Sequence, residues 1–276
     1  GGKDVTVNAK GQNVNIGTAV ASAPTGAVVV NQADIFTGNT NAVLNGTNPG
    51  NVTVRGGTDV TINTTGGNVA VGGVVGGVNT VPSGAVKVTN TFGGVGADTV
   101  TVQGGTTVDI TTTKTSGAIT VGANSAALNA AGTALKNANL APTGNVTIAT
   151  KTVSGANTAY GTGVVNVNTN GAATVSVTGG NLDSITDIQS TLATGGANAG
   201  KAIGTSTLKN VVIDNQQAGG VVAIRSDALT NLTVTNQKGA ADTITITNNT
   251  AAHALTITPG GNSTAGNTVQ IVDATA

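Results

Sequence analysis

Apolar and polar residues alternate in short stretches along most of the 276-residue chain. Stretches such as Val5-Thr6-Val7 and Val52-Thr53-Val54 place every second side chain on the same face, which is the period of a β-strand. The alternating residues are mostly Val, Ile and Thr, which fit pleated strands better than helices. Gly and Asn separate the stretches and permit tight corners. The pattern predicts an all-β protein.

The alternating stretches recur in a fixed order. The stretch at residues 1–8 returns at 56–63 and, more loosely, at 104–111, and three further strands follow each copy. We therefore interpret residues 1–170 as three tandem four-strand repeats. Residues 171–276 form a second β-repeat region, in which two strands recur every 21 to 25 residues, a spacing that suits one coil carrying two strands.

The strands are too short to bury a face within a hairpin, but stacked coils would cover one another around a thin aliphatic core. We therefore predict an elongated parallel β-solenoid (β-helix) with loop insertions. The alternative is a row of tandem small β-sandwich domains, since turn signals every 8–12 residues are also typical of sandwiches. Residues 124–140 are expected to carry a short helical turn, and residues 182–192 a short helix or capping segment.

The composition narrows the class of protein. Aromatic residues make up 1% of the chain and charged residues 8%, the formal net charge is zero, and cysteine is absent. A neutral chain with almost no aromatics is a poor nucleic-acid binder, and no apolar run is long enough for a membrane-spanning helix. The lack of cysteine, with the excess of Gly, Thr and Asn, favours a secreted bacterial surface protein. The start at Gly1 suggests a processed product or a piece of a longer chain.

Two Thr- and Asn-rich stretches carry a resemblance to a known class. Leu229-Thr230-Asn231-Leu232-Thr233-Val234-Thr235-Asn236 and Ala241-Asp242-Thr243-Ile244-Thr245-Ile246-Thr247-Asn248 are similar to segments of bacterial β-strand-repeat surface proteins. That class includes S-layer proteins and filamentous-haemagglutinin-like adhesins. The resemblance implies export, a β-helical fold and a mechanical or adhesive role. It carries over no active site.

One segment suggests calcium as a candidate cofactor. Residues 93–101 fit the glycine-rich nonapeptide of calcium-binding toxin repeats, with Asp98 as the carboxylate ligand. The neighbouring copy supplies Asp109, but it lies 11 residues away instead of nine and lacks the middle glycine. The alternative interpretation is a glycine turn before a strand, with no cofactor.

Residues suited to catalysis are scarce. All 11 acidic residues are Asp, and only Asp183 and Asp187 stand close enough to share a helical face. His253 is the only histidine and is expected in a solvent-facing loop, so a catalytic triad or a multi-histidine metal site is not expected. We predict that the protein is not an enzyme. The strip Thr243-Ile244-Thr245-Ile246-Thr247 invites ice binding, but unequal coil lengths argue against one regular plane.

These observations predict a structural, extracellular or cell-surface protein. The first expectation is a subunit or segment of a bacterial surface layer or filament that assembles with copies of itself, because solenoid ends expose strand edges. The alternatives are an adhesin stalk or spacer and a β-helical polysaccharide-active protein. The expected partner is the chain itself, with surface polysaccharide as a second candidate, and neither nucleic acid nor a membrane span is expected.

Overall fold

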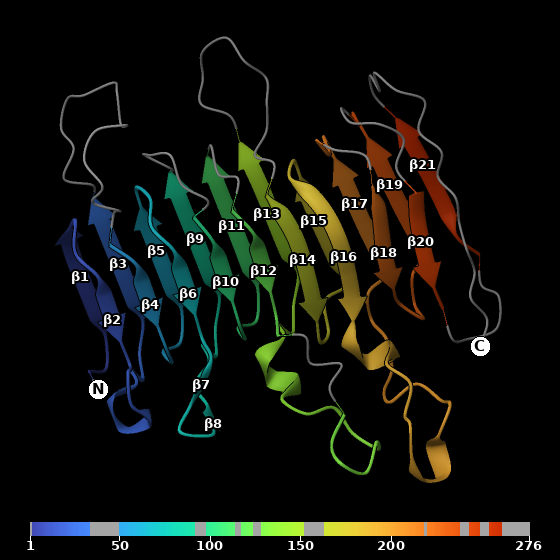
Figure 1. Ribbon diagram of the computed structural model, residues 1–276, viewed down its shortest axis with the longest axis horizontal. Coiled ribbons are helices and arrows are strands. Elements are labelled where there is room, and N and C mark those ends of the chain that lie inside the picture. The colour runs from blue at the N-terminus through green and yellow to red at the C-terminus, as the bar shows by residue number, and fades with distance from the viewer. Residues whose placement is uncertain are drawn as a thin grey trace.

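The protein is a stack of β-coils (Figure 1). The computed structural model describes residues 2–33, 50–91, 98–113, 117–123, 128–151, 163–217, 220–237, 243–248 and 254–260. Two large sheets run the length of the stack, and every strand pair within them is parallel. Each coil supplies one strand to each sheet, so the chain rises through the stack as a two-sheet β-solenoid, as the alternation predicts. The uniformly parallel pairing rules out the tandem sandwiches, which are antiparallel.

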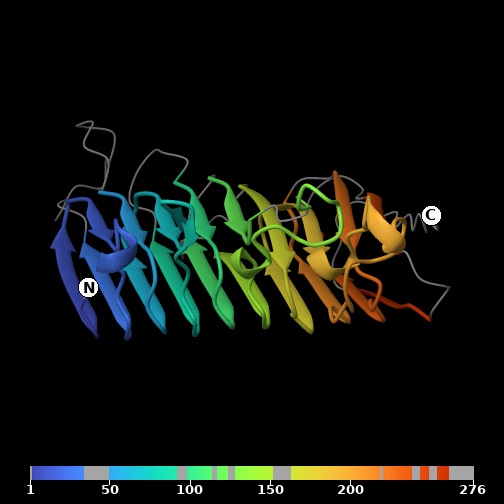
Figure 2. The same cartoon turned by 90° about the horizontal axis from the view of Figure 1, so that it is seen from below.

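The bounds of the elements follow the predicted stretches closely. The ten-stranded sheet consists of β1 (Val5–Lys10), β3 (Val28–Ala33), β5 (Val60–Thr64), β9 (Val86–Thr91), β11 (Val108–Thr113), β13 (Val146–Lys151), β15 (Thr174–Thr178), β17 (Asn210–Asp214), β19 (Asn231–Thr235) and β21 (Thr256–Gly260). The nine-stranded sheet consists of β2 (Val14–Ile16), β4 (Val52–Val54), β6 (Val69–Val71), β10 (Val100–Val102), β12 (Ile119–Val121), β14 (Val164–Thr169), β16 (Asn181–Asp187), β18 (Val221–Arg225) and β20 (Thr243–Thr247). Viewed from below, the coils succeed one another along the long axis (Figure 2).

The core lies between the two sheets and is almost entirely Val, Ile and Leu. In β5 the inward residues Val60 and Ile62 are fully buried while Thr61 faces outward, and the same alternation recurs in most strands. Burying a Val or Ile side chain contributes about 1.5–3 kcal/mol. Because each coil covers the next, the buried residues form one continuous cluster along the stack. Strands too short to be stable alone are stabilised in this way.

Polar side chains close the core at the ends of several strands of the ten-stranded sheet. Gln32, Thr64 and Asn90 occupy the same inward register position and are buried. Gln32 Nε2 donates to the carbonyl of Gly50 at 2.6 Å, and Thr64 Oγ1 donates to Gln32 Oε1 at 2.8 Å. These bonds satisfy groups that would otherwise be costly to bury.

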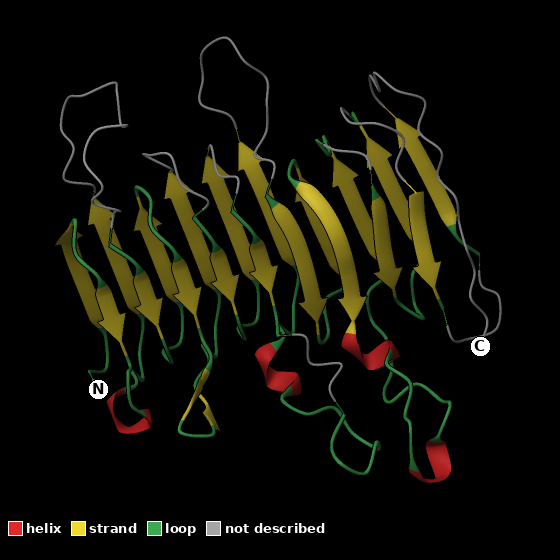
Figure 3. Cartoon of the chain, in the orientation of Figure 1, coloured by secondary structure: helices red, strands yellow, loops and turns green. Residues whose placement is uncertain are grey.

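The four-strand repeat of the sequence corresponds to two coils, of which the first carries an insertion. Insertions follow β2, β6, β12 and β16, and the connections after the intervening coils are short. All four lie on one side of the stack, here called the lower rim (Figure 3). They contain the 3-10 turns η1 (Val20–Ser22), η2 (Ala138–Leu140), η3 (Ile188–Ser190) and η4 (Gly196–Asn198), and the antiparallel hairpin β7 (Val74–Val75) and β8 (Val78–Asn79).

The same coil architecture continues past residue 170, where the sequence changes texture. Strand β13 pairs with β15 and β14 pairs with β16, so both sheets cross this point without a break. The alternation of insertions also continues, because the fourth insertion follows β16. The short helical turn expected within residues 124–140 is present as η2.

The expectation of a short helix over residues 182–192 is wrong for most of that segment. Residues up to Asp187 belong to β16, and only η3 beyond them is helical. The register of β14 with β16 shifts after Leu182, which brings Leu182 and then Ile185 to the inward face. This irregularity gives the buried residues the three-residue spacing that, in the sequence alone, imitates a helix.

Candidate functional site

Only one of the two predicted calcium ligands lies in a strand. Asp98 lies two residues before β10 of the nine-stranded sheet, whereas Asp109 is an exposed residue of β11 in the ten-stranded sheet, in register with Lys87 and Thr147. Residues 93–97, the glycine-rich part of the motif, lie outside the described residues. Among the described residues, no three His, Cys, Asp or Glu side chains gather as a metal site would require.

Asp98 lies at a corner where burial and a hydrogen bond have opposite effects on the pKa of its carboxyl group. Its Oδ2 accepts a hydrogen bond from the backbone N–H of Gly67 at 3.0 Å. Burial raises the pKa of the Asp98 carboxyl above its ordinary value, and the Gly67 hydrogen bond partly offsets that rise. Gly67 lies between β5 and β6 and Asp98 between β9 and β10, so the interaction joins the corresponding corners of two adjacent coils, which is a structural role.

Asp183 and Asp187 do not share a helical face, since both lie in β16. Asp183 is exposed and Asp187 is fully buried. His253 lies outside the described residues. Asp183 and Asp187 therefore do not form a pair of carboxyl groups on one face.

The burial of Asp187 is the feature that the sequence analysis missed. Its Oδ1 accepts from the backbone N–H of Gln189 at 3.1 Å, and its Oδ2 accepts from the N–H groups of Thr207 at 2.8 Å and Leu208 at 3.1 Å. Ser206 Oγ donates to the same Oδ2 at 2.6 Å. Asp187 thus fastens both ends of the insertion that follows β16. The signal was present: counted from Ile185, Asp187 occupies the next inward position.

A serine cluster extends this network into the next coil. Ser206 Oγ lies 3.0 Å from Ser190 Oγ and 3.1 Å from Ser226 Oγ. Ser226 is buried and donates to the carbonyl of Leu208 at 2.7 Å. A serine nucleophile requires an adjacent base. The carboxyl group that contacts Ser206 is that of Asp187, which is fully buried beneath the insertion that it holds. The cluster is built to hold the insertion against β18.

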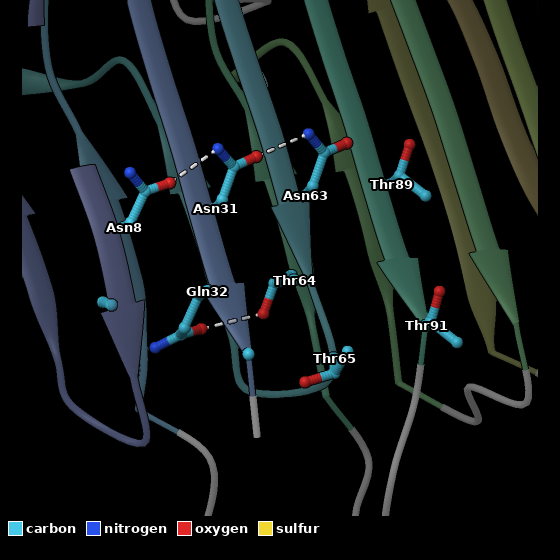
Figure 4. Close-up of a pocket in the computed structure, with 10 residues that line it drawn as sticks. Asn8, Asn31, Gln32, Asn63, Thr64, Thr65, Thr89 and Thr91 are labelled. Atoms are coloured by element: carbon cyan, nitrogen blue, oxygen red, sulfur yellow. Dashed lines mark hydrogen bonds between the residues drawn. The ribbon is translucent and has the colours of Figure 1, made fainter. Parts of the chain in front are cut away.

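A shallow groove of ≈ 390 Å³ crosses the first four strands of the ten-stranded sheet (Figure 4). Along it, Asn31 Nδ2 donates to Asn8 Oδ1 and Asn63 Nδ2 donates to Asn31 Oδ1, both at 2.9 Å, and Thr89 stands next in the row. These residues share one register position on successive strands. The described residues that line the groove include no titratable side chain. The groove can offer hydrogen bonds from amides and hydroxyls, but no acid or base.

Neighbouring insertions on the lower rim touch one another. Asn79 of β8 donates from Nδ2 to Asn137 Oδ1 at 3.4 Å, and the N–H of Thr194 donates to the carbonyl of Gly132 at 3.0 Å. Val74 and Val78 of the hairpin remain 43% and 49% exposed. The rim therefore presents connected loops with some apolar surface, and its described residues include no group of three or more His, Cys, Asp or Glu side chains that could hold a metal ion.

Comparison with known proteins identifies no relative. No family model matches the chain, and neither a curated protein nor a solved structure does. The described residues contain no helix long and apolar enough to cross a membrane. Function must therefore be argued from the coil stack itself.

Proposed function

We propose that the chain is a structural subunit or segment of an extracellular surface layer or filament, and that it acts by assembling with copies of itself. The observation that carries this proposal is that each described coil binds the next through the strand edges of both sheets and through one continuous apolar core. Copies of a chain built in this way can add to one another as its own coils do. An exposed strand edge with an uncovered apolar face readily pairs with another chain.

The chemistry of the surface supports a passive role. Among the residues that the structure describes, no three His, Cys, Asp or Glu side chains gather into a cluster. The formal net charge is zero, which reduces the repulsion between copies. We therefore propose a function without catalysis, at the cell surface, and without a cofactor.

Electron microscopy of the purified chain tests this proposal. We expect ordered filaments or lattices in negative stain, with calcium and equally after addition of a chelator, because Asp98 lies at the corner before β10 while Asp109 lies within β11 of the other sheet. Isolated, monodisperse rods under both conditions would contradict self-assembly and favour the adhesin stalk. Loss of order in chelator would contradict the cofactor-free form of the proposal.

A further inference from the structure

The groove on the outer face of the ten-stranded sheet is lined by two rows of side chains that face the solvent (Figure 4). In the first row, Asn31 of β3 and Asn63 of β5 are register partners, and Thr89 of β9 continues the row. The second row lies two residues further along the strands and includes Ala33 and Thr91. These five residues are exposed or half-buried, so a ligand can reach both rows from solvent.

The amide ladder leaves hydrogen-bonding groups free for a ligand. A side-chain amide has two N–H hydrogens and two lone pairs on its oxygen. Asn31 uses one N–H for Asn8 and one lone pair for Asn63, so one of each remains. Within the described part of the chain, Asn63 Oδ1 and the hydroxyls of Thr89 and Thr91 have no hydrogen-bond partner. The rows therefore present donors and acceptors on three successive strands of the sheet.

Methyl groups lie beside these polar groups. Ala33 contributes one to the second row, and Thr89 and Thr91 each carry one next to the hydroxyl. The described lining contains neither an ionisable nor an aromatic side chain. A sugar ring combines the same two kinds of surface, with C–H groups on its faces and hydroxyl groups around its edge. The groove therefore matches a sugar in the contacts that it can make.

Two other classes of ligand fit the groove less well. A charged ligand would lose water without gaining an opposite charge, which is unfavourable. An extended peptide adds to the free edge of a sheet, but β3 and β5 are each paired on both sides. The face of the sheet thus offers only side chains, and these are uncharged.

We propose that the groove binds an uncharged, extended glycan that runs across the strands, parallel to the long axis of the stack. Neighbouring strands lie about 4.8 Å apart, which is close to the length of one sugar residue in an extended β-linked chain. Each sugar would then place a hydroxyl group against the first row and a C–H face against the second. A tetrasaccharide would cover the groove from β1 to β9. This binding goes beyond the proposed function, which requires no ligand.

Titration with neutral oligosaccharides tests the class of ligand. The probes are cellotetraose, mannotetraose and chitotetraose (the N-acetylated form), three uncharged β-linked chains, with tetragalacturonate as a charged chain of equal length. We expect at least one neutral probe to shift the side-chain amide signals of Asn31 and Asn63 in NMR spectra. The corresponding disaccharide reaches fewer strands and should bind at least about tenfold more weakly. No shift with any neutral probe at millimolar concentration, or equal binding of tetragalacturonate, would overturn the proposal.

Filling the groove tests its location. Ala33→Leu adds bulk at an exposed position of the second row, so the tetrasaccharide should bind at least about tenfold more weakly. The control Ala223→Leu places the same side chain at an exposed alanine of β18, in the other sheet. This control should bind the tetrasaccharide as the natural chain does. Binding that survives Ala33→Leu unchanged would place the site elsewhere.

Removing one hydroxyl tests the polar row. Thr89→Val keeps the shape of the side chain but loses the hydrogen bond, so the dissociation constant should rise about two- to tenfold. Thr111 is the register partner of Thr89 on β11 and lies outside the described lining. Thr111→Val should therefore leave binding unchanged, and equal effects of the two valine variants would contradict the proposed contact. Circular dichroism checks that each variant folds.

The outcomes separate this inference from the proposed function. Ordered filaments or lattices from a chain that binds none of the neutral tetrasaccharides would overturn the glycan site and leave self-assembly intact. Tetrasaccharide binding by a chain that remains as isolated rods would support the site and refute the layer.

Discussion

At the lower rim the chain leaves the nine-stranded sheet after β6 and after β16, and the two corners are packed in opposite ways. After β6 the chain turns on Gly72, at φ +72°, where a Cβ atom would lie 2.1 Å from the carbonyl oxygen of Gln103 in the next coil. After β16 it turns at Asp187, whose carboxyl group accepts hydrogen bonds from the insertion that follows. One corner is closed by the absence of a side chain and the other by a buried polar one. The stack thus tolerates different corner chemistry while the sheets stay in register.

The largest effect is expected from removing the polar closure. Asp187→Ala leaves the N–H groups of the half-buried Thr207 and the buried Leu208 without their acceptor, which should cost about 3–4 kcal/mol of unfolding free energy. Amide exchange at Thr207 and Leu208 should accelerate more than exchange in the first four coils. The exposed Asp183→Ala, on the same strand, should change stability by less than about 0.5 kcal/mol. Equal effects of the two variants would contradict the anchoring role.

Filling the glycine corner should have the next largest effect. Gly72→Ala combines left-handed strain with a steric clash against Gln103 and should cost about 2–4 kcal/mol. The matched control is Gly76→Ala in the β7–β8 turn, where φ is +54° and no atom lies within 4 Å of the added Cβ. That variant should lose only about 1–2 kcal/mol from strain. Thermal unfolding of both variants measures the difference, and a Gly72 variant no weaker than the Gly76 variant would show that the coils can move apart freely.

Removing contacts far from either corner should lower the free energy of unfolding by a smaller amount. Asn31→Ala removes two exposed side-chain hydrogen bonds of the ladder and should cost about 1 kcal/mol. Asn63→Ala removes one of them and should cost about half as much. Chemical denaturation of the two variants checks this gradation. A loss as large as that of Asp187→Ala would mean that the outer face, and not the corners, holds the coils together.

The smallest effect is expected at Asp98, on the opposite rim. Because burial raises the pKa of Asp98, the folded state favours the protonated carboxyl group over the charged one. Its stabilising contribution is therefore present below the ordinary carboxyl pKa of 3.8 and is lost as the pH rises through the raised value. Asp98→Asn should raise the unfolding temperature slightly at pH 7, by about 0.5 kcal/mol or less in free energy, and give no gain below the ordinary pKa. A gain that persists at low pH would point to a cause other than charge.

The alternation of single residues was sufficient to predict the strands and the solenoid. Val60-Thr61-Ile62, for example, reads directly as one buried and one exposed face, and the structure confirms it. The same reasoning failed at residues 182–187, because an irregular register shifts the buried positions without leaving a mark in composition. The sequence pattern also predicted units of four strands, but it did not show that each unit makes two coils. The length of a strand does not tell to which of the two sheets the strand belongs.

The site-level features were harder to foresee than the fold. The network of Asp187 with Ser206 joins residues 19 positions apart, and only the path of the insertion brings them together. The calcium motif was read from local spacing and stays a prediction, because its glycine-rich residues 93–97 lie outside the described residues; Asp98 lies before β10, whereas Asp109 lies within β11.

The parallel register of the coils also determines how the molecule would respond to a pulling force. Val86 and Val108 are register partners on adjacent strands, so 22 residues of chain, from 86 to 108, advance the stack by a single strand spacing of about 4.8 Å. Fully extended, 22 residues reach about 75 Å. Tension applied at the end of the stack would detach one coil at a time, each releasing roughly fifteen times its folded length. A rod of this kind can lengthen stepwise under load while the remaining coils stay folded.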